Sequence, residues 1–96
     1  MSDVTVRDNS EASRYEAVLD GEVVGLADYR LDGTTMEITH TETDAGHQGQ
    51  GIAGEVVRTA LDAAREAGLK VIPTCPYVEN WIAEHPEYQE LLAEKG

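Results

Sequence analysis

The amino-acid sequence predicts an α+β fold, an α/β sandwich in which helices cover one mostly antiparallel sheet. Two observations carry this prediction. Short segments rich in Val, Tyr, Thr and Leu alternate with turn signals through the first half of the chain. In the second half, apolar residues recur every three or four positions, which is the period of a helix. The 96 residues suit one domain, which we expect to span residues 1–96.

Four strands are expected in the first half, because dipeptides typical of tight turns divide it: Asn9-Ser10, Asp20-Gly21 and Asp32-Gly33. The strands are placed at residues 4–8, 14–19, 22–30 and 35–41.

The fourth strand carries two candidate functional residues. A period of two puts His40 on the same face as Met36 and Ile38, and Glu37 on the face of Thr39 and Thr41. Glu37 and His40 are therefore expected to point in opposite directions.

The main helix is predicted over residues 52–67. Its apolar side chains form one stripe from Ile52 to Ala67, and charged residues fill the opposite face. Gly68 is expected to end the helix as a left-handed C-terminal residue.

The remaining elements are short. A fifth strand is predicted at residues 70–73, with Pro73 interrupting the neighbouring ladder. A helix at residues 78–84 places Trp81 and Ile82 inward, and a last helical stretch covers residues 88–94.

The charge of the chain excludes several partners. Nineteen acidic and seven basic residues give a net charge of −12, which argues against nucleic acids and anionic membranes. Two interpretations stay open: an ordinary acidic protein, or one built for a high-salt cytoplasm. The first ten residues form no signal peptide and no long apolar run follows, so we expect a soluble, cytoplasmic protein. The single cysteine, Cys75, forms no internal disulfide, and no Cys/His pairs have zinc spacing, so no metal is expected.

The segment from Gly46 to Gly54 holds four glycines in nine residues, just before the main helix. Such a segment costs conformational entropy unless the backbone needs unusual dihedral angles or close contact with a ligand. At a helix N-terminus, backbone amides favour an anion such as phosphate. The alternative is a tight turn without a ligand.

Two phosphate motifs overlap in this segment. Gly49-Gln50-Gly51-Ile52-Ala53-Gly54 fits the dinucleotide fingerprint, but the acidic residue expected about 20 positions later is missing from residues 70–75. No Gly-Lys-Ser/Thr follows, which excludes a Walker loop. The second motif, Gln48-Gly49-Gln50-Gly51-Ile52-Ala53, matches the Gln/Arg-x-x-Gly-x-Gly/Ala signature of the GNAT acetyltransferase superfamily.

The wider context also resembles the small single-domain class of that superfamily over residues 14–92. It includes Thr39-His40-Thr41-Glu42, Pro73-Thr74-Cys75-Pro76-Tyr77 and His85-Pro86-Glu87-Tyr88. The resemblance implies a minimal GNAT-like fold, acetyl-CoA as cosubstrate and acetyl transfer to an amine that the sequence does not identify. It implies that the coenzyme is held by Thr41, Glu42, Thr43, Gln48, Gly49, Gln50, Gly51, Ile52, Ala53 and Gly54. A monomer or weak dimer is expected.

Acetyl transfer needs a base for the amine and a proton donor for the departing thiolate. Glu37 and His40 are candidate bases, with a solvated strand residue and a core-margin histidine as the alternatives. The resemblance makes Cys75 the proposed nucleophile, although no Lys or Arg adjoins it and a buried apolar role is the alternative. Tyr77 is a candidate donor to the thiolate, or a packing residue.

Two other functions stay open. One is a non-catalytic acyl-CoA-binding or sensor module, and the other is an interaction domain that binds no coenzyme. Only an enzyme releases free thiol from acetyl-CoA when amines are offered, and an interaction domain is not stabilised by coenzyme A at all.

The high-salt interpretation predicts how stability depends on salt. At about 1 M salt the Debye length is about 3 Å, which screens repulsion among the acidic side chains. The midpoint of thermal unfolding, followed by circular dichroism, should therefore hold or rise as KCl is raised to molar levels. Unfolding on addition of KCl would contradict this interpretation.

Overall fold

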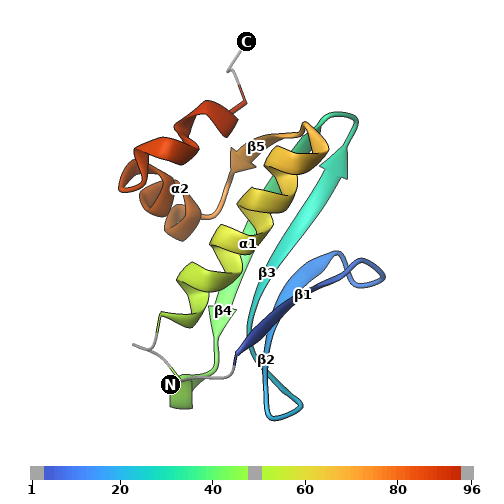
Figure 1. Ribbon diagram of the computed structural model, residues 1–96, viewed down its shortest axis with the longest axis vertical. Coiled ribbons are helices and arrows are strands. Elements are labelled where there is room, and N and C mark those ends of the chain that lie inside the picture. The colour runs from blue at the N-terminus through green and yellow to red at the C-terminus, as the bar shows by residue number, and fades with distance from the viewer. Residues whose placement is uncertain (1–3, 48–50, 94–96) are drawn as a thin grey trace.

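The computed structural model describes residues 4–47 and 51–93. Its five strands form one sheet in sequence order, and all neighbouring pairs are antiparallel except the last, in which β4 and β5 are parallel (Figure 1). The strands are β1 (Thr5–Asn9), β2 (Arg14–Leu19), β3 (Glu22–Asp32), β4 (Thr35–Thr43) and β5 (Lys70–Pro73). The predicted fold class is confirmed: this is an α+β fold in which helices accompany one mostly antiparallel sheet.

Turn chemistry sets the hairpin between β2 and β3. Asp20 and Gly21 have φ angles of 52° and 83°, the left-handed pair that a two-residue hairpin turn needs. Asp tolerates this region better than most side chains, and Gly has no Cβ to oppose it.

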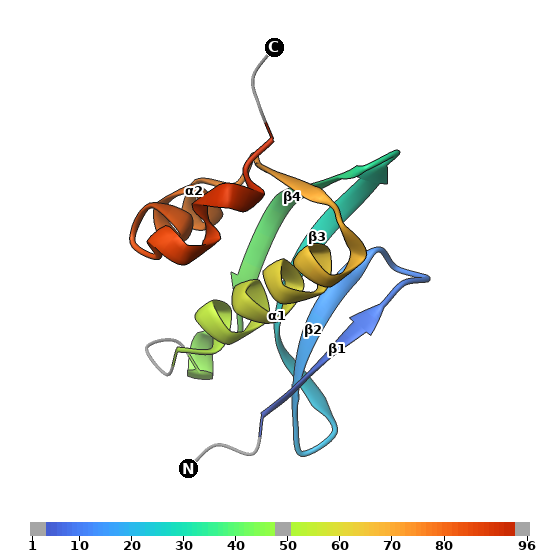
Figure 2. The same ribbon diagram turned by 45° about the horizontal axis from the view of Figure 1, so that its top comes forward.

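Helix α1 (Ile52–Ala67) lies across one face of the sheet (Figures 1 and 2). Its apolar stripe packs against strand residues that share this face. The fully buried side chains of this core include Ile38, Ile52, Val56, Val57, Leu61 and Val71. The predicted end of the helix is confirmed, since Gly68 caps it with a φ angle of 75°.

The C-terminal elements are anchored to α1. Helix α2 (Pro76–Ala83) and the 3-10 helix η2 (Pro86–Leu91) pack beside it, and a second 3-10 turn, η1 (Ala45–His47), precedes α1. The Tyr88 hydroxyl donates to Asp62 at 2.7 Å, and Arg65 donates to the Glu87 carbonyl at 2.6 Å. Leu92 then forms a parallel bridge with Val71, at the outer edge of β5.

Several predicted boundaries were wrong. Strands β3 and β4 each run two residues further than expected, and α2 begins at Pro76 because proline fits the first helical turn. The last helical stretch is a 3-10 helix from Pro86 to Leu91, not residues 88–94, because the chain leaves it at Leu92 to join β5.

A β-bulge at Thr39 corrects the predicted faces of β4. Tyr29 pairs with Ile38 and its neighbour Asp28 with His40, so Thr39 is an extra residue in the ladder. After this extra residue, the side chains of β4 that follow point to the opposite faces from those that a strict period of two predicts. His40 is exposed, and by register it lies on the same face as Glu37, not beside Met36 and Ile38 as expected.

Strands β4 and β5 diverge at one point. Their pairing ends at Ile38 and Pro73, as the proline predicted, and a tight turn follows in which the Thr74 amide donates to the Ile72 carbonyl at 3.1 Å. One further bond, from the Cys75 amide to the Ile38 carbonyl at 3.0 Å, holds the two chains at the fork. Strand β4 continues to Thr43, and no described strand pairs with this side of it beyond the fork.

Two further observations bear on membrane and metal sites. Within residues 4–47 and 51–93, no helix is long and apolar enough to span a bilayer. In the same ranges, no group of three His, Cys, Asp or Glu side chains is placed to hold a metal ion.

The close approach of β3 to α1 makes Gly25 a test of the packing. A Cβ on Gly25 would lie 2.7 Å from Cγ2 of Ile52, a distance that forces the helix start to move. Gly25→Ala should lower the free energy of unfolding by about 1–3 kcal/mol, measured by chemical denaturation.

The matched control is Gly46→Ala, whose new Cβ would meet only Oδ2 of Asp44, at 3.6 Å. This change should stay within about 0.5 kcal/mol. Equal effects of the two substitutions would contradict the proposed contact between β3 and α1.

Candidate active site

A cavity of about 450 Å³ opens where β4, α1 and α2 meet. It brings together residues that lie up to 36 positions apart in the chain, from the end of β4, the start of α1 and the first turn of α2. Its lining residues are Thr41, Glu42, Thr43, Gly51, Ile52, Ala53 and Tyr77. Six of these seven were predicted to hold the coenzyme, and Tyr77 was a candidate proton donor.

The start of α1 is built to present backbone donors. Gly51 is its N-cap in the left-handed region, with φ 76°, and no side chain caps the helix. The bond from the Glu55 amide to the Gly51 carbonyl, at 3.1 Å, lies within the first turn, so the amides before Glu55 point along the helix axis. Together with the helix dipole they favour a negatively charged group at this end. The predicted residues Gln48, Gly49 and Gln50 lie outside the described residues.

Gly54, the last predicted coenzyme residue, lies under two aromatic side chains and not on the cavity wall. A Cβ here would be 3.4 Å from Nε1 of Trp81 and 3.7 Å from the Tyr77 hydroxyl. Trp81 and Ile82 belong to the core, as predicted. Tyr77 is 42% exposed and lines the cavity, so its ring is only partly buried. Burial of its ring, and then the charge of Glu84, raise the pKa of Tyr77, so its hydroxyl keeps its proton at neutral pH.

Cys75 lies at the fork between β4 and β5, as the residue before α2, and is 8% exposed. Its Sγ lies 3.6 Å from the hydroxyl oxygen of Thr41. Burial alone raises the pKa of this thiol. Hydrogen bonds from the Thr41 hydroxyl and from the amides of Val78, Tyr77 and Thr41 outweigh burial, and the pKa is lowered. Cys75 does not line the cavity itself, but Thr41 lines the cavity and contacts the thiol.

Glu37 lies on the other side of the same fork. It is half-buried, and its carboxylate accepts a hydrogen bond from the hydroxyl of Thr74, the residue before Cys75. Glu37 pairs with Ile72 in the last part of the parallel ladder. Two consecutive residues after β5 thus bond to two consecutive residues of β4: the Thr74 hydroxyl to the Glu37 carboxylate, and the Cys75 amide to the Ile38 carbonyl.

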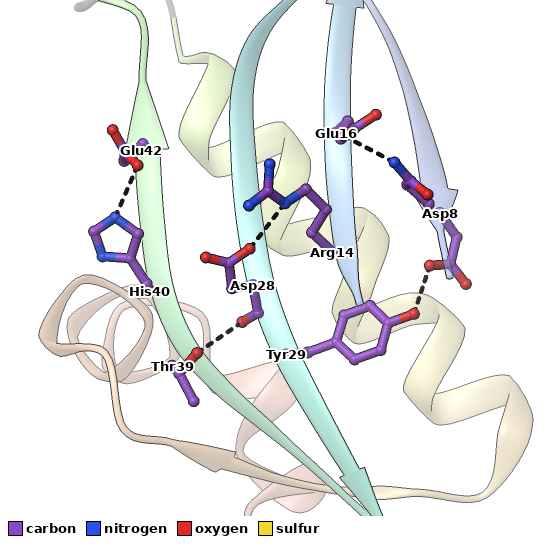
Figure 3. A network of polar contacts seen from close by, with 9 residues as sticks. Asp8, Arg14, Glu16, Asp28, Tyr29, Thr39, His40 and Glu42 are labelled. Atoms are coloured by element: carbon purple, nitrogen blue, oxygen red, sulfur yellow. Dashed lines mark hydrogen bonds and ion pairs between the residues drawn. The ribbon is translucent and has the colours of Figure 1, made fainter. Parts of the chain in front are cut away.

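His40 lies on the exposed face of β4 and points toward Glu42 (Figure 3). Its Nε2 lies 3.1 Å from Oε2 of Glu42, and the two side chains are 55% and 64% exposed. The neighbouring pair of Arg14 and Asp28, at 3.0 Å, continues this face across β2 and β3. The prediction that His40 packs at the core margin is wrong, because the bulge at Thr39 turns it outward.

Sequence reasoning missed the contacts that Thr41 and Thr74 make with the candidate catalytic groups, although Thr41 was expected to hold the coenzyme. Thr41 was expected on the face of Glu37, yet the bulge turns it to the side of Cys75. Thr74 carried no signal in the sequence beyond its place next to Cys75. Both contacts depend on where β5 lies beside β4, which no local pattern specifies.

A family model described as GCN5-related N-acetyl-transferase matches residues 14–91. Among curated proteins, NATD1 from Homo sapiens is 36% identical over 59 residues, which cover 59% of this chain and 52% of that protein. NATD1 from Xenopus tropicalis is 35% identical over 60 residues, or 60% of this chain and 55% of that protein. The chain thus matches about half the length of these relatives.

Solved structures show the same fold. A GCN5-like protein from Staphylococcus aureus has a TM-score of 0.70 at 21% identity, covering 100% of this chain and 94% of that one. Rv2747 from Mycobacterium tuberculosis, solved in complex with CoA and NLQ, has a TM-score of 0.63 at 27% identity, covering 80% and 50%. Because the family model covers most of the residues that build the fold and the cavity, the chain belongs to the GCN5-related N-acetyltransferase family.

Proposed function

We propose that this protein binds acetyl-CoA in the cavity at the start of α1 and transfers the acetyl group to an amine. The observation that carries the proposal is the cavity itself, which joins the glycine-led start of α1 to the unpaired side of β4. The complex of the related Rv2747 with CoA supports the choice of coenzyme.

The phosphates of the coenzyme would be held by backbone amides. Of the residues that line the cavity, none is basic, and the whole chain carries a net charge of −12. Side-chain charge therefore cannot attract a polyanion here. The amides and the dipole of α1 favour negative charge without any basic side chain, provided that the anion lies within the first turn.

The pantetheine arm would lie along the unpaired side of β4. An open strand edge offers both amide donors and carbonyl acceptors, and the arm contains two amide groups that pair with such an edge as a strand does. From the start of α1, this path leads along Thr43 and Thr41 toward the fork. The thioester would then lie beside Cys75.

Cys75 is the proposed nucleophile. Its thiolate attacks the thioester carbon, the bond from Sγ to the acetyl carbon forms, and the bond to the sulfur of CoA breaks. The departing thiolate takes the proton of the Tyr77 hydroxyl. The donors around Sγ stabilise the thiolate in the resting protein, which is what such an attack needs.

In the second step the amine attacks the acetylated Cys75, and the Cys75 thiolate leaves. Glu37 is the proposed base that takes the amine proton, since its carboxylate lies at the fork next to Thr74. His40, on the same face, is disfavoured as the base, because it is paired with Glu42 and Glu37 is the one that contacts the residue before Cys75.

The coenzyme site can be tested with two glycines at opposite ends of α1. Gly51→Glu places a negative side chain at the cavity, and like charges at such distances cost several kcal/mol, so the affinity for acetyl-CoA should fall by about a hundredfold or more. Isothermal titration calorimetry and the thermal shift caused by acetyl-CoA measure this effect.

Gly68→Glu is the matched control for this substitution. The φ angle of Gly68 is 75°, nearly the same as the 76° of Gly51. The substitution makes the same change of charge, but at the far end of the helix. Its cost in stability should be about 1–2 kcal/mol, as for Gly51→Glu, but its affinity for acetyl-CoA should be unchanged. Equal affinities of the two variants would refute the assignment of the site.

The nucleophile can be tested by Cys75→Ala. This variant should bind acetyl-CoA normally and lose at least about a hundredfold of the amine-dependent release of CoA thiol. Mass spectrometry of the unmodified protein after a brief incubation with acetyl-CoA should show one acetyl group on Cys75. Full turnover by Cys75→Ala would assign the chemistry to direct attack by the amine. Binding without any turnover by the unmodified protein would favour the acyl-CoA-binding module.

A further inference from the structure

We propose that the indole N–H of Trp81 donates a hydrogen bond to an oxygen of the bound coenzyme. Trp81 would then be a coenzyme-binding residue as well as part of the core. This inference rests on the proposed function, since it concerns the same cavity, but it adds a contact that neither the motif nor the cavity lining includes.

The ring of Trp81 is fixed from several sides. His85 stacks on it, with ring centroids 3.8 Å apart and an interplanar angle of 11°. Tyr88 meets it edge-on at 5.1 Å, and the guanidinium carbon of Arg58 lies 5.5 Å from its centroid. Trp81 is 8% exposed, so little of the ring is free to move. Its N–H is therefore a donor held in one direction.

That donor has no acceptor within the described part of the chain. Nε1 of Trp81 takes part in none of the hydrogen bonds there, although Tyr88, His85 and Arg65 in the same cluster all have partners. In the same ranges, no side-chain nitrogen or oxygen is both sealed from solvent and unpaired. Within residues 4–47 and 51–93 the indole N–H therefore has no acceptor, although its side chain is more than nine-tenths buried.

The N–H lies beside the first turn of α1. A Cβ on Gly54 would be 3.4 Å from Nε1 and 3.7 Å from the Tyr77 hydroxyl, which places both groups over the same turn. Tyr77 and Ala53, the neighbour of Gly54, line the cavity. Two side-chain donors therefore lie next to the backbone donors at the helix start.

The backbone amides at the start of α1 and the indole N–H can only donate, and the Tyr77 hydroxyl can donate as well, so this part of the cavity favours a ligand rich in acceptors. Among the residues that line the cavity, Glu42 is the one carboxylate, and it is paired with His40. The diphosphate and the pantetheine carbonyls of acetyl-CoA supply such oxygens. A buried donor that is fixed before the ligand arrives loses little entropy on binding, which favours affinity.

The unmodified protein provides the first test, because Trp81 is its only tryptophan and gives a single indole N–H signal. In a ¹⁵N-labelled sample titrated with acetyl-CoA, this signal should shift together with the backbone amides of Gly51, Ile52 and Ala53. The titration requires no substitution, so it tests the contact between Trp81 and the coenzyme even where a variant fails to fold.

Trp81→Phe is the second test, since phenylalanine keeps an aromatic ring and removes the N–H. Its affinity for acetyl-CoA should fall by about tenfold, the effect of one hydrogen bond. Tyr88→Phe is the matched control: it removes a donor from the same cluster, but that donor already has Asp62 as its acceptor. This control should lose stability and keep its affinity.

The outcomes separate the two proposals. If acetyl-CoA shifts the amides at the start of α1 while the indole signal stays in place, the role of Trp81 is overturned and the proposed function stands. Unchanged affinity of a folded Trp81→Phe variant overturns the role of Trp81 in the same way. If acetyl-CoA neither binds nor shifts any signal, the proposed function fails and the role of Trp81 fails with it.

Discussion

The divergence of β4 and β5 beyond Ile38 is the constraint on which the rest of the site depends. The parallel ladder stops at Pro73, the chain turns at Thr74, and the Cys75 amide makes the last bond to β4. The candidate catalytic groups lie at this fork. The thiol of Cys75 lies against Thr41, the carboxylate of Glu37 accepts from Thr74, and the unpaired side of β4 leads to the cavity. A ladder that ran two residues further would close this opening.

The proposed coenzyme is a polyanion, and backbone donors would let so acidic a chain bind it. The described basic side chains are mostly engaged elsewhere. Arg7 bonds to the buried Glu16, Arg14 pairs with Asp28, and Arg65 and Lys70 bond to carbonyls of η2. Burial alone raises the pKa of Glu16, but hydrogen bonds from Asn9 and Arg7 outweigh burial and lower it, so the charge is kept in the fold. The basic residues thus stabilise the structure, and the helix start is left to receive the anion.

The sequence predicted the order of all five strands, the main helix and its two ends, because these follow from local patterns. Turn dipeptides, a helical apolar stripe and a C-terminal glycine each act through their nearest neighbours in the chain. Most of the residues that line the cavity were also expected at the coenzyme site, but that expectation came from the family resemblance and not from a local pattern. The faces of β4 were wrong beyond Ile38. A bulge is a property of a pair of strands, and the partner residues Asp28 and Tyr29 carry no signal for it.

By itself, the sequence determined that a glycine-rich turn precedes a helix, and it predicted that a polyanion bound there would be held by amides and not by side-chain charge. Only the tertiary structure decided what surrounds that turn. It brings Cys75 to Thr41, whose hydroxyl is one of the hydrogen-bond donors that outweigh burial and lower the pKa of the thiol. It also places the indole nitrogen of a core tryptophan beside the first turn of α1. These contacts join residues more than 25 positions apart, and only the packing of α2 against the other elements fixes the distances between them.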